Sequence, residues 1–287
     1  MKKGLMLTNA MLSSERDPVL FAYGAEVLRK YDLQLIEYYT KEDELAKEYG
    51  KIVRDNGFIG LFHSALDQKR SGWCRLCAEE ETLRQKSLDF SKWTIEKAIA
   101  SGAIRAVIQS GTFPEDAKNE AKCWDALKES VRELAEFVGN DIELGIEPCD
   151  RSMDVRQLIG PAMATYTFMQ ELDRKNVVLT LDTAHIALTF EDPVAAVKLC
   201  KPFCDHVHIA NCVLDPADPL FGDKHPLFSY PNGAINDEQA QTMYSRICSM
   251  YEGEEFYVSA EMIGREKDEK AYFAKMLESM PWFFKAV

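Results

Sequence analysis

The sequence predicts an α/β fold, a (β/α)8 barrel, and two observations support this prediction. Eight short apolar runs alternate with helical patterns along the 287 residues. No linker or low-complexity tract interrupts them, so we expect residues 1–287 to form one domain. Eight βα units are the number that closes such a barrel. A doubly wound open sheet is the alternative, but it requires a Gly-rich phosphate loop after an early strand, and "LTNAMLSSERD" does not provide one.

Each strand is predicted from an apolar run, and each helix from apolar residues at three- and four-residue spacing. The expected strands span 3–8, 33–38, 57–63, 104–109, 142–147, 177–182, 205–210 and 256–261. The expected helices span 19–31, 41–55, 87–101, 118–138, 154–175, 192–201, 237–252 and 267–279. The helix at 118–138 has the clearest pattern, with Trp124, Leu127 and Val131 on one face and Gly139 at its end.

Charge and apolar patterning limit the possible partners. The net charge of −13 argues against a broad basic surface for nucleic acid or for an anionic membrane. No segment approaches the roughly 18 apolar residues that span a bilayer, and the N-terminal run "GLML" is too short for a signal peptide. With eight scattered cysteines, these features predict a cytoplasmic protein whose thiols are reduced.

One C-x-x-C motif is present, in "WCRLC", at Cys74 and Cys77. A structural zinc site requires four ligands, and no second pair of cysteines has a fitting spacing. We therefore interpret the two residues as free thiols.

Polar residues end nearly every expected strand. Four of the five histidines lie at or just past strand ends, whereas random placement would put some of them on helices. The strand-end residues are Glu37, His63, Gln109, Glu147, Asp182 with His185, His206 with His208, and Glu261; the fifth histidine, His225, lies in the long loop at 211–233. Because active sites of such barrels form at the carboxyl ends of the strands, we expect these side chains to converge.

The alternation of side chains supports this expectation. His206 and His208 share one face of their strand, opposite Val207 and Ile209, so the polar pair points into the barrel. Three carboxylates and an imidazole on one axis would repel one another without a cation. Glu147, Asp182, His208 and Glu261 form an oxygen and nitrogen ligand set suited to Mn²⁺, Mg²⁺ or Co²⁺, with Zn²⁺ also compatible. The alternative is four separate buried polar groups, each with its own hydrogen-bond partner.

The order of these motifs resembles the xylose isomerase-like TIM-barrel superfamily, which contains sugar isomerases, epimerases and the endonuclease IV type of abasic-site nuclease. The matching motifs are Glu147, "LDTAH" with Asp182 and His185, "HVH" with His208, and Glu261. Within the ketose 3-epimerase branch, the resemblance implies one divalent metal, with Mn²⁺ favoured. Glu147 and Glu261 would then exchange protons with the substrate carbon.

The resemblance also implies substrate contacts. "EPCDRSM" is similar to the Glu-Pro-x-x-Arg segment of the epimerases, so Arg151 is expected to bind a substrate oxygen. Met153 occupies the position of a second glutamate that this branch often has, which departs from the pattern. Further substrate contacts are expected from His185, His63, Glu37, Gln109, Asp223 and His225. The loop at 211–233 is expected to be an ordered wall that carries Asp223 and His225 towards the metal, or else a surface excursion.

Three other functions remain open. The trinuclear zinc site of the nuclease branch would map onto the same strand ends, with "GDKHP" supplying Asp223 and His225, but Gln109 stands where that branch has histidine. A metal-dependent lyase acting on 3-oxo-sugars or glycosides would use the same carboxylates. A non-catalytic carbohydrate-binding barrel is the third.

We predict a sugar isomerase or epimerase that removes a proton next to a carbonyl through a metal-held enediolate. Its partner is then a small sugar rather than nucleic acid or membrane, and homo-oligomerisation stays open.

Overall fold

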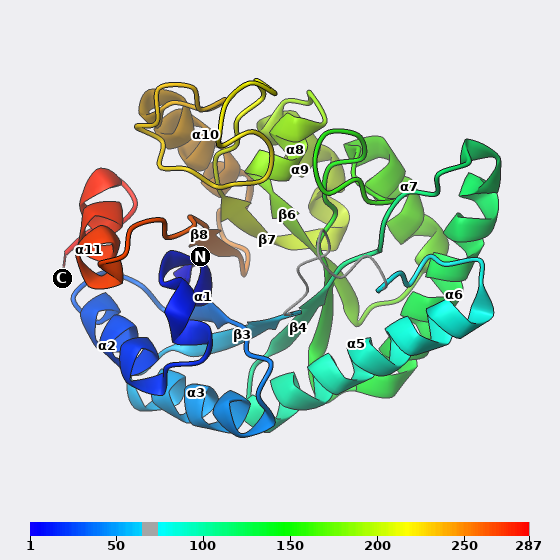
Figure 1. Ribbon diagram of the computed structural model, residues 1–287, viewed down its shortest axis with the longest axis horizontal. Coiled ribbons are helices and arrows are strands. Elements are labelled where there is room, and N and C mark those ends of the chain that lie inside the picture. Colours follow the sequence, from blue (N-terminus) through cyan, green and yellow to red (C-terminus); the bar gives the residue numbers. More distant parts are fainter. Residues whose placement is uncertain (65–73, 287) are drawn as a thin grey trace.

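Eight parallel strands form a closed barrel in the computed structural model, which describes residues 1–64 and 74–286 (Figure 1). Each strand pairs with the next along the chain, and β1 pairs with β8 to close the barrel. The strands are β1 Lys2–Met6, β2 Leu35–Tyr38, β3 Ile59–His63, β4 Arg105–Ile108, β5 Glu143–Ile146, β6 Val177–Asp182, β7 Cys204–Ile209 and β8 Tyr257–Ala260. The predicted (β/α)8 fold is confirmed.

Helices surround the strands (Figure 1). They are α1 Leu7–Ala10, α2 Pro18–Leu28, α3 Asp43–Asp55, α5 Glu81–Ser101, α6 Glu120–Val138, α7 Ala162–Leu172, α8 Thr183–Leu188, α9 Pro193–Cys200, α10 Asp237–Met250 and α11 Glu269–Ser279. Short 3-10 turns at Leu12–Glu15, Ala117–Asn119 and Lys201–Phe203 join some of them. The first strand is shorter than predicted, because the chain turns into α1 directly after Met6.

One predicted helix begins later than expected. The sequence suggested a helix at 154–175, whereas α7 begins at Ala162, after Gly160 and Pro161. The carboxylate of Asp150 accepts hydrogen bonds from the backbone N–H groups of residues 153–155, at 2.7 to 2.8 Å, and holds this segment as a loop. A Cβ atom on Gly160 would lie 2.1 Å from the carbonyl oxygen of Cys149, so the loop packs against the end of β5.

The barrel interior is polar towards the carboxyl ends of the strands, whereas Leu35, Leu61 and Tyr257 form a small apolar cluster further down. His206 and His208 are buried inside, whereas Val207 and Ile209 join the apolar core between the strands and the helices. Lower in the barrel, the buried guanidinium of Arg105 pairs with Glu143 at 2.6 Å and with Asp205 at 2.8 Å.

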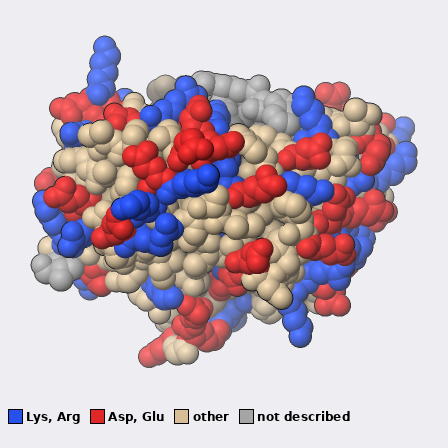
Figure 2. Space-filling view, turned by 90° about the horizontal axis from the view of Figure 1, so that it is seen from below, with Lys and Arg blue, Asp and Glu red and all other residues tan. Residues whose placement is uncertain are grey.

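Three further predictions concerned membrane segments, surface charge and the C-x-x-C cysteines. No helix within residues 1–64 and 74–286 is long and apolar enough to cross a membrane. On the face in Figure 2, acidic and basic side chains are interspersed. Cys74 and Cys77 are buried and are not linked by a disulfide.

Candidate metal centre and substrate pocket

Four side chains from neighbouring strands converge at the carboxyl end of the barrel. Glu147 follows β5, Asp182 ends β6, His208 lies in β7 and Glu261 follows β8. Potential ligand atoms of all four lie within 4.8 Å of one another. Nδ1 of His208 lies 3.3 Å from Oε1 of Glu147, 3.6 Å from Oδ2 of Asp182 and 2.7 Å from Oε2 of Glu261.

Three of the converging atoms are buried and form no hydrogen bond of regular geometry, although two of them, Nδ1 of His208 and Oε2 of Glu261, lie 2.7 Å apart. They are Oδ2 of Asp182, Nδ1 of His208 and Oε2 of Glu261. Buried polar atoms are normally satisfied, and leaving them unpaired is costly. A divalent cation would satisfy all three at once and neutralise the carboxylates, so the donor set fits such an ion.

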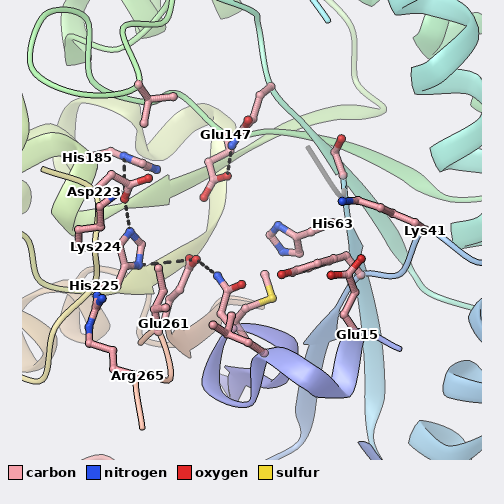
Figure 3. Close-up of a pocket in the computed structure, with 18 of the residues that line it drawn as sticks. Glu15, Lys41, His63, Glu147, His185, Asp223, Lys224, His225, Glu261 and Arg265 are labelled. Carbon is pink, nitrogen blue, oxygen red and sulfur yellow. Dashed lines mark hydrogen bonds and ion pairs between the residues drawn. The ribbon is translucent and has the colours of Figure 1, made fainter. Parts of the chain in front are cut away.

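The two glutamates are held in matching ways. Oε2 of Glu147 accepts a hydrogen bond from the Gln109 amide at 3.1 Å, and Oε1 of Glu261 accepts one from the Asn9 amide at 2.6 Å. In each case the other carboxylate oxygen faces His208. Figure 3 shows Glu147 and Glu261 on opposite sides of the pocket.

Asp182 is held by its position at a helix start. Its Oδ1 atom accepts hydrogen bonds from the backbone N–H groups of Ala184, at 2.6 Å, and His185, at 3.1 Å, and so caps α8. This cap orients the carboxylate and leaves Oδ2 directed at the cluster. Asp182 pairs with His208 in the barrel register, which puts both residues at the same level.

Glu37 lies beneath this cluster. It is fully buried, and its carboxylate contacts Nε2 of His206 at 2.9 Å, Nε2 of His208 at 3.0 Å and Nε2 of His63. Glu37 does not line the pocket, unlike His63, so its contact with a substrate stays a prediction. Its position instead fixes the histidines.

The charges of these groups depend on one another. Burial would raise the pKa of Glu147, but His208 holds the pKa at about 2. Burial would likewise raise the pKa of Glu37, yet His206 and His208 lower it well below its ordinary value. Burial would lower the pKa of His208, but Glu37 and Glu261 outweigh this effect and raise the pKa well above its ordinary value. Burial lowers the pKa of His206 to about 4. Glu147 and Glu37 are thus ionised at neutral pH, while His206 is neutral.

A second cluster lies beside the first. It consists of His185 from α8 and of Asp223 and His225 from the loop between β7 and α10, and their potential ligand atoms lie within 4.8 Å of one another. Asp223 bonds to Nε2 of His225, and Nδ1 of His225 lies 3.6 Å from Glu261. Burial would lower the pKa of His225, but the nearby carboxylates of Asp223 and Glu261 raise it to about 10. The loop thus brings both residues close to Glu261.

A cavity of about 590 Å³ opens above both clusters. Glu147, Glu261, His63, Gln109, His185, Asp223 and His225 line it. Arg151 does not line it, contrary to the prediction, because its guanidinium bonds to Glu120 and to the carbonyl oxygen of Leu158, both at 2.8 Å. A substrate in this cavity would not reach that side chain.

Other pocket residues were missing from the sequence prediction. Asn9 follows the first strand, and the rule applied to the other strand ends would have found it. Arg16, Lys41 and Arg265 lie in loops after different strands, and no local pattern distinguishes them from ordinary surface charges.

The sequence profile of the xylose isomerase-like TIM barrel family matches residues 24–232, most of the chain. The chain belongs to this family. No curated protein matches its sequence. Three solved structures show similar folds, and at 16 to 19% identity they support the fold alone.

The first is the D-psicose 3-epimerase of Clostridium cellulolyticum H10, with 17% identity, 99% of each chain covered and a TM-score of 0.69. The second is the 3-keto-D-glucoside 4-epimerase of E. coli, with 16% identity, 98% of each chain covered and a TM-score of 0.68. The third is an AP endonuclease of family 2 from Brucella melitensis, with 19% identity and a TM-score of 0.68, covering 96% of this chain and 99% of the other.

Proposed function

We propose that this protein is a divalent-metal-dependent sugar isomerase or epimerase that transfers a proton at a carbon next to a carbonyl. The matched arrangement of Glu147 and Glu261 is the observation that carries the proposal. Each glutamate directs one oxygen at the cation position, each is held by an amide, and the two lie on opposite sides of the pocket. A pair of carboxylates so arranged suits proton removal from one face of a carbon and proton return to the other.

The chain's own groups would divide the reaction between them. A bound divalent cation, for which we propose Mn²⁺ held by Glu147, Asp182, His208 and Glu261, would polarise the carbonyl and so acidify the neighbouring C–H bond. One glutamate takes the proton from carbon as an enediolate forms in the substrate, and the other returns a proton. His185 and His63 line the pocket and would donate hydrogen bonds to the substrate oxygens on which negative charge develops.

Deuterium incorporation tests this proposal directly. The protein is incubated in D₂O with Mn²⁺ and a panel of free ketoses and 3-oxo-glycosides, and the carbon-bound hydrogen is followed by NMR. We expect deuterium at the carbon next to the carbonyl and the appearance of an epimer or isomer. An eliminated fragment from a 3-oxo-glycoside would assign the lyase alternative instead.

Two variants locate the proton transfer. Glu147→Gln and Glu261→Gln should each reduce exchange by about 100-fold or more, because each removes an acid–base group. Glu129→Gln, an exposed change on α6, is the control and should keep full activity. Full exchange in both pocket variants would contradict the proposal.

A phosphodiesterase acting at abasic DNA sites is the second candidate, and the cluster of His185, Asp223 and His225 favours it because it could hold another ion. Against it, Gln109 bonds to Glu147 where that type of site uses an imidazole. Metal analysis separates the candidates. About one manganese per chain favours the epimerase, whereas two or three zinc ions with cleavage of an abasic duplex would favour the nuclease.

A further inference from the structure

A buried thiol lies where the two clusters of the pocket meet. Cys149 follows β5, two residues after Glu147, and is 1% exposed. Its sulfur and one potential ligand atom each from Glu147 and His185 lie within 4.8 Å of one another. Glu147 belongs to the four-ligand centre and His185 to the second cluster, so this third group takes one member from each. Figure 3 shows Glu147 and His185 next to each other in the pocket.

His185 has a ring nitrogen that the fold leaves unpaired. The residue is only 5% exposed, and its Nδ1 atom is buried without a hydrogen bond. Oδ1 of Asp223 lies 3.8 Å from this nitrogen, which is too far for a hydrogen bond. Leaving a buried imidazole nitrogen unpaired is costly, and a neutral imidazole is a common metal ligand. Coordination of a cation by this ring would break no hydrogen bond of Nδ1.

The Cys149 sulfur is also available, and the backbone that carries it is held in place. Sγ of Cys149 donates a weak hydrogen bond to the carbonyl oxygen of Glu147, with the two atoms 3.8 Å apart. This contact uses the thiol proton and leaves the sulfur lone pairs unused. The close packing of Gly160 on the carbonyl oxygen of Cys149 fixes the loop at this point. The thiol therefore keeps its place beside the two pocket residues.

The two groups that share Glu147 differ in the chemistry of their ligands. The four-ligand centre offers three carboxylates and one imidazole, which suit a cation that prefers oxygen, such as Mn²⁺. The group with Cys149 offers one sulfur, one nitrogen and one oxygen atom. Thiolate ligands favour softer cations, and bonds of about 2.1 to 2.3 Å to such atoms are usual for Zn²⁺. Small side-chain movements would bring the three atoms to these distances.

We propose that Glu147, Cys149 and His185 form an additional binding site for a thiophilic divalent cation, Zn²⁺ or Cd²⁺, and that an ion bound there inhibits the protein. Three protein ligands leave a fourth position for water. As the ion binds, a metal–sulfur bond replaces the S–H bond and the proton leaves to solvent. The ion also occupies two groups that line the pocket, Glu147 and His185. The inhibition rests on the proposed function, whereas the binding does not.

Titration with Cd²⁺ tests the binding. Cd²⁺ is added to the Mn²⁺-loaded protein, and the ultraviolet charge-transfer band of a cadmium–thiolate bond is recorded. We expect the band to saturate at about one Cd²⁺ per chain and X-ray absorption to show one sulfur ligand. Cys149→Ser should remove the band and weaken Cd²⁺ binding by about 100-fold or more, while the affinity for Mn²⁺ stays within about twofold. The unchanged Mn²⁺ affinity shows that the variant is folded.

Two further variants separate this site from other places where Cd²⁺ could bind. Cys248→Ser is the matched control, because Cys248 on α10 is partly exposed and distant in sequence from the pocket residues. It should keep the band. Asp182→Asn should weaken Mn²⁺ binding and also keep the band, because Asp182 is not a member of the group with Cys149. Absence of a band at saturating Cd²⁺, or a band that persists in Cys149→Ser and disappears in Cys248→Ser, would overturn the inference.

Deuterium exchange measures the inhibition. One equivalent of Cd²⁺ should lower the exchange rate of the Mn²⁺-loaded protein by about tenfold or more, because the ion occupies a proposed acid–base group. In Cys149→Ser the ratio of the rates without and with Cd²⁺ should be close to one. A band that depends on Cys149 without any loss of exchange would overturn the inhibition. If no sugar exchanges even without Cd²⁺, the proposed sugar function fails, and the cadmium band still decides whether the site exists.

Discussion

The carboxylate of Glu37 accepts a hydrogen bond from Nε2 of His208 at 3.0 Å, directly beneath the candidate metal centre. This bond keeps the proton of a neutral His208 on Nε2 and leaves the lone pair of Nδ1 directed at Glu147, Asp182 and Glu261. The same carboxylate holds His206 and His63, so one residue orients three imidazoles. A carboxylate behind a histidine ligand raises its basicity and fixes its ring, and the arrangement here has that form.

Glu37→Gln should therefore weaken cation binding without removing any proposed ligand. We expect the affinity for Mn²⁺ to fall by about 10- to 100-fold, the usual effect of losing such a partner. Isothermal titration of Mn²⁺ into the metal-free protein measures the change. Glu44→Gln, an exposed change in α3, is the control and should leave the affinity unaltered. Unchanged affinity in Glu37→Gln would mean that His208 is not a ligand or does not need this support.

Cation binding should also release protons. Glu37 and Glu261 raise the pKa of His208 well above its ordinary value, so at neutral pH a proton occupies the cluster until a cation displaces it. Apparent Mn²⁺ affinity should consequently rise with increasing pH across the neutral range. Titrations in buffers of different ionisation enthalpy would give the number of protons released, which we expect to be about one. An affinity independent of pH from about 6 to 8 would contradict this prediction.

The amides behind the two glutamates should affect turnover more than metal content. Asn9→Ala and Gln109→Ala each remove one hydrogen bond from a proposed acid–base group, to Glu261 and Glu147 respectively. We expect each change to lower the deuterium exchange rate by about tenfold, the usual consequence of losing a bond to a charged group. Metal content measured by mass spectrometry should stay near that of the unmodified protein. Loss of metal together with activity would instead show that the amides chiefly hold ligands.

The convergence of strand ends could be predicted because it follows from chain order alone. Parallel strands in a closed barrel bring their carboxyl ends to one rim, so the polar residue ending each strand is expected there. The depth of each side chain could not be predicted this way. Glu37 and Glu147 both end strands, yet Glu37 lies beneath three histidines while Glu147 lines the pocket.

The loop residues that line the pocket were harder to predict than the strand-end residues, because their positions depend on contacts between distant segments. Arg151 lies just past a strand end but bonds to Glu120 of α6, which no local pattern indicates. Lys41 and Arg265 are separated by more than two hundred residues and share one pocket only because β8 pairs with β1, which pairs with β2.

The late start of α7 leads to a stability prediction. Gly160 packs so closely on the carbonyl of Cys149 that a Cβ atom there would overlap it, and this contact supports the loop that follows Glu147. Gly160→Ala should destabilise the protein by about 2 kcal/mol or more through backbone displacement. A Cβ atom at Gly57 would have no other atom within 4 Å. Gly57→Ala should therefore lower the free energy of unfolding only through its positive φ of 82°, by about 1 kcal/mol. Urea denaturation compares the two, and an equal loss in both would contradict the close contact.

Cation binding should finally be visible in the stability of the whole barrel. The four proposed ligands come from β5 to β8, so they converge only in the folded chain, and a cation that binds them stabilises the folded state by mass action. At a free Mn²⁺ concentration 100 times the dissociation constant, the free energy of unfolding should rise by about 2.7 kcal/mol. Chelation should reverse the gain, as measured by thermal denaturation with and without Mn²⁺. Asp182→Asn should abolish most of the gain, whereas a gain of the same size in that variant would place the bound cation elsewhere.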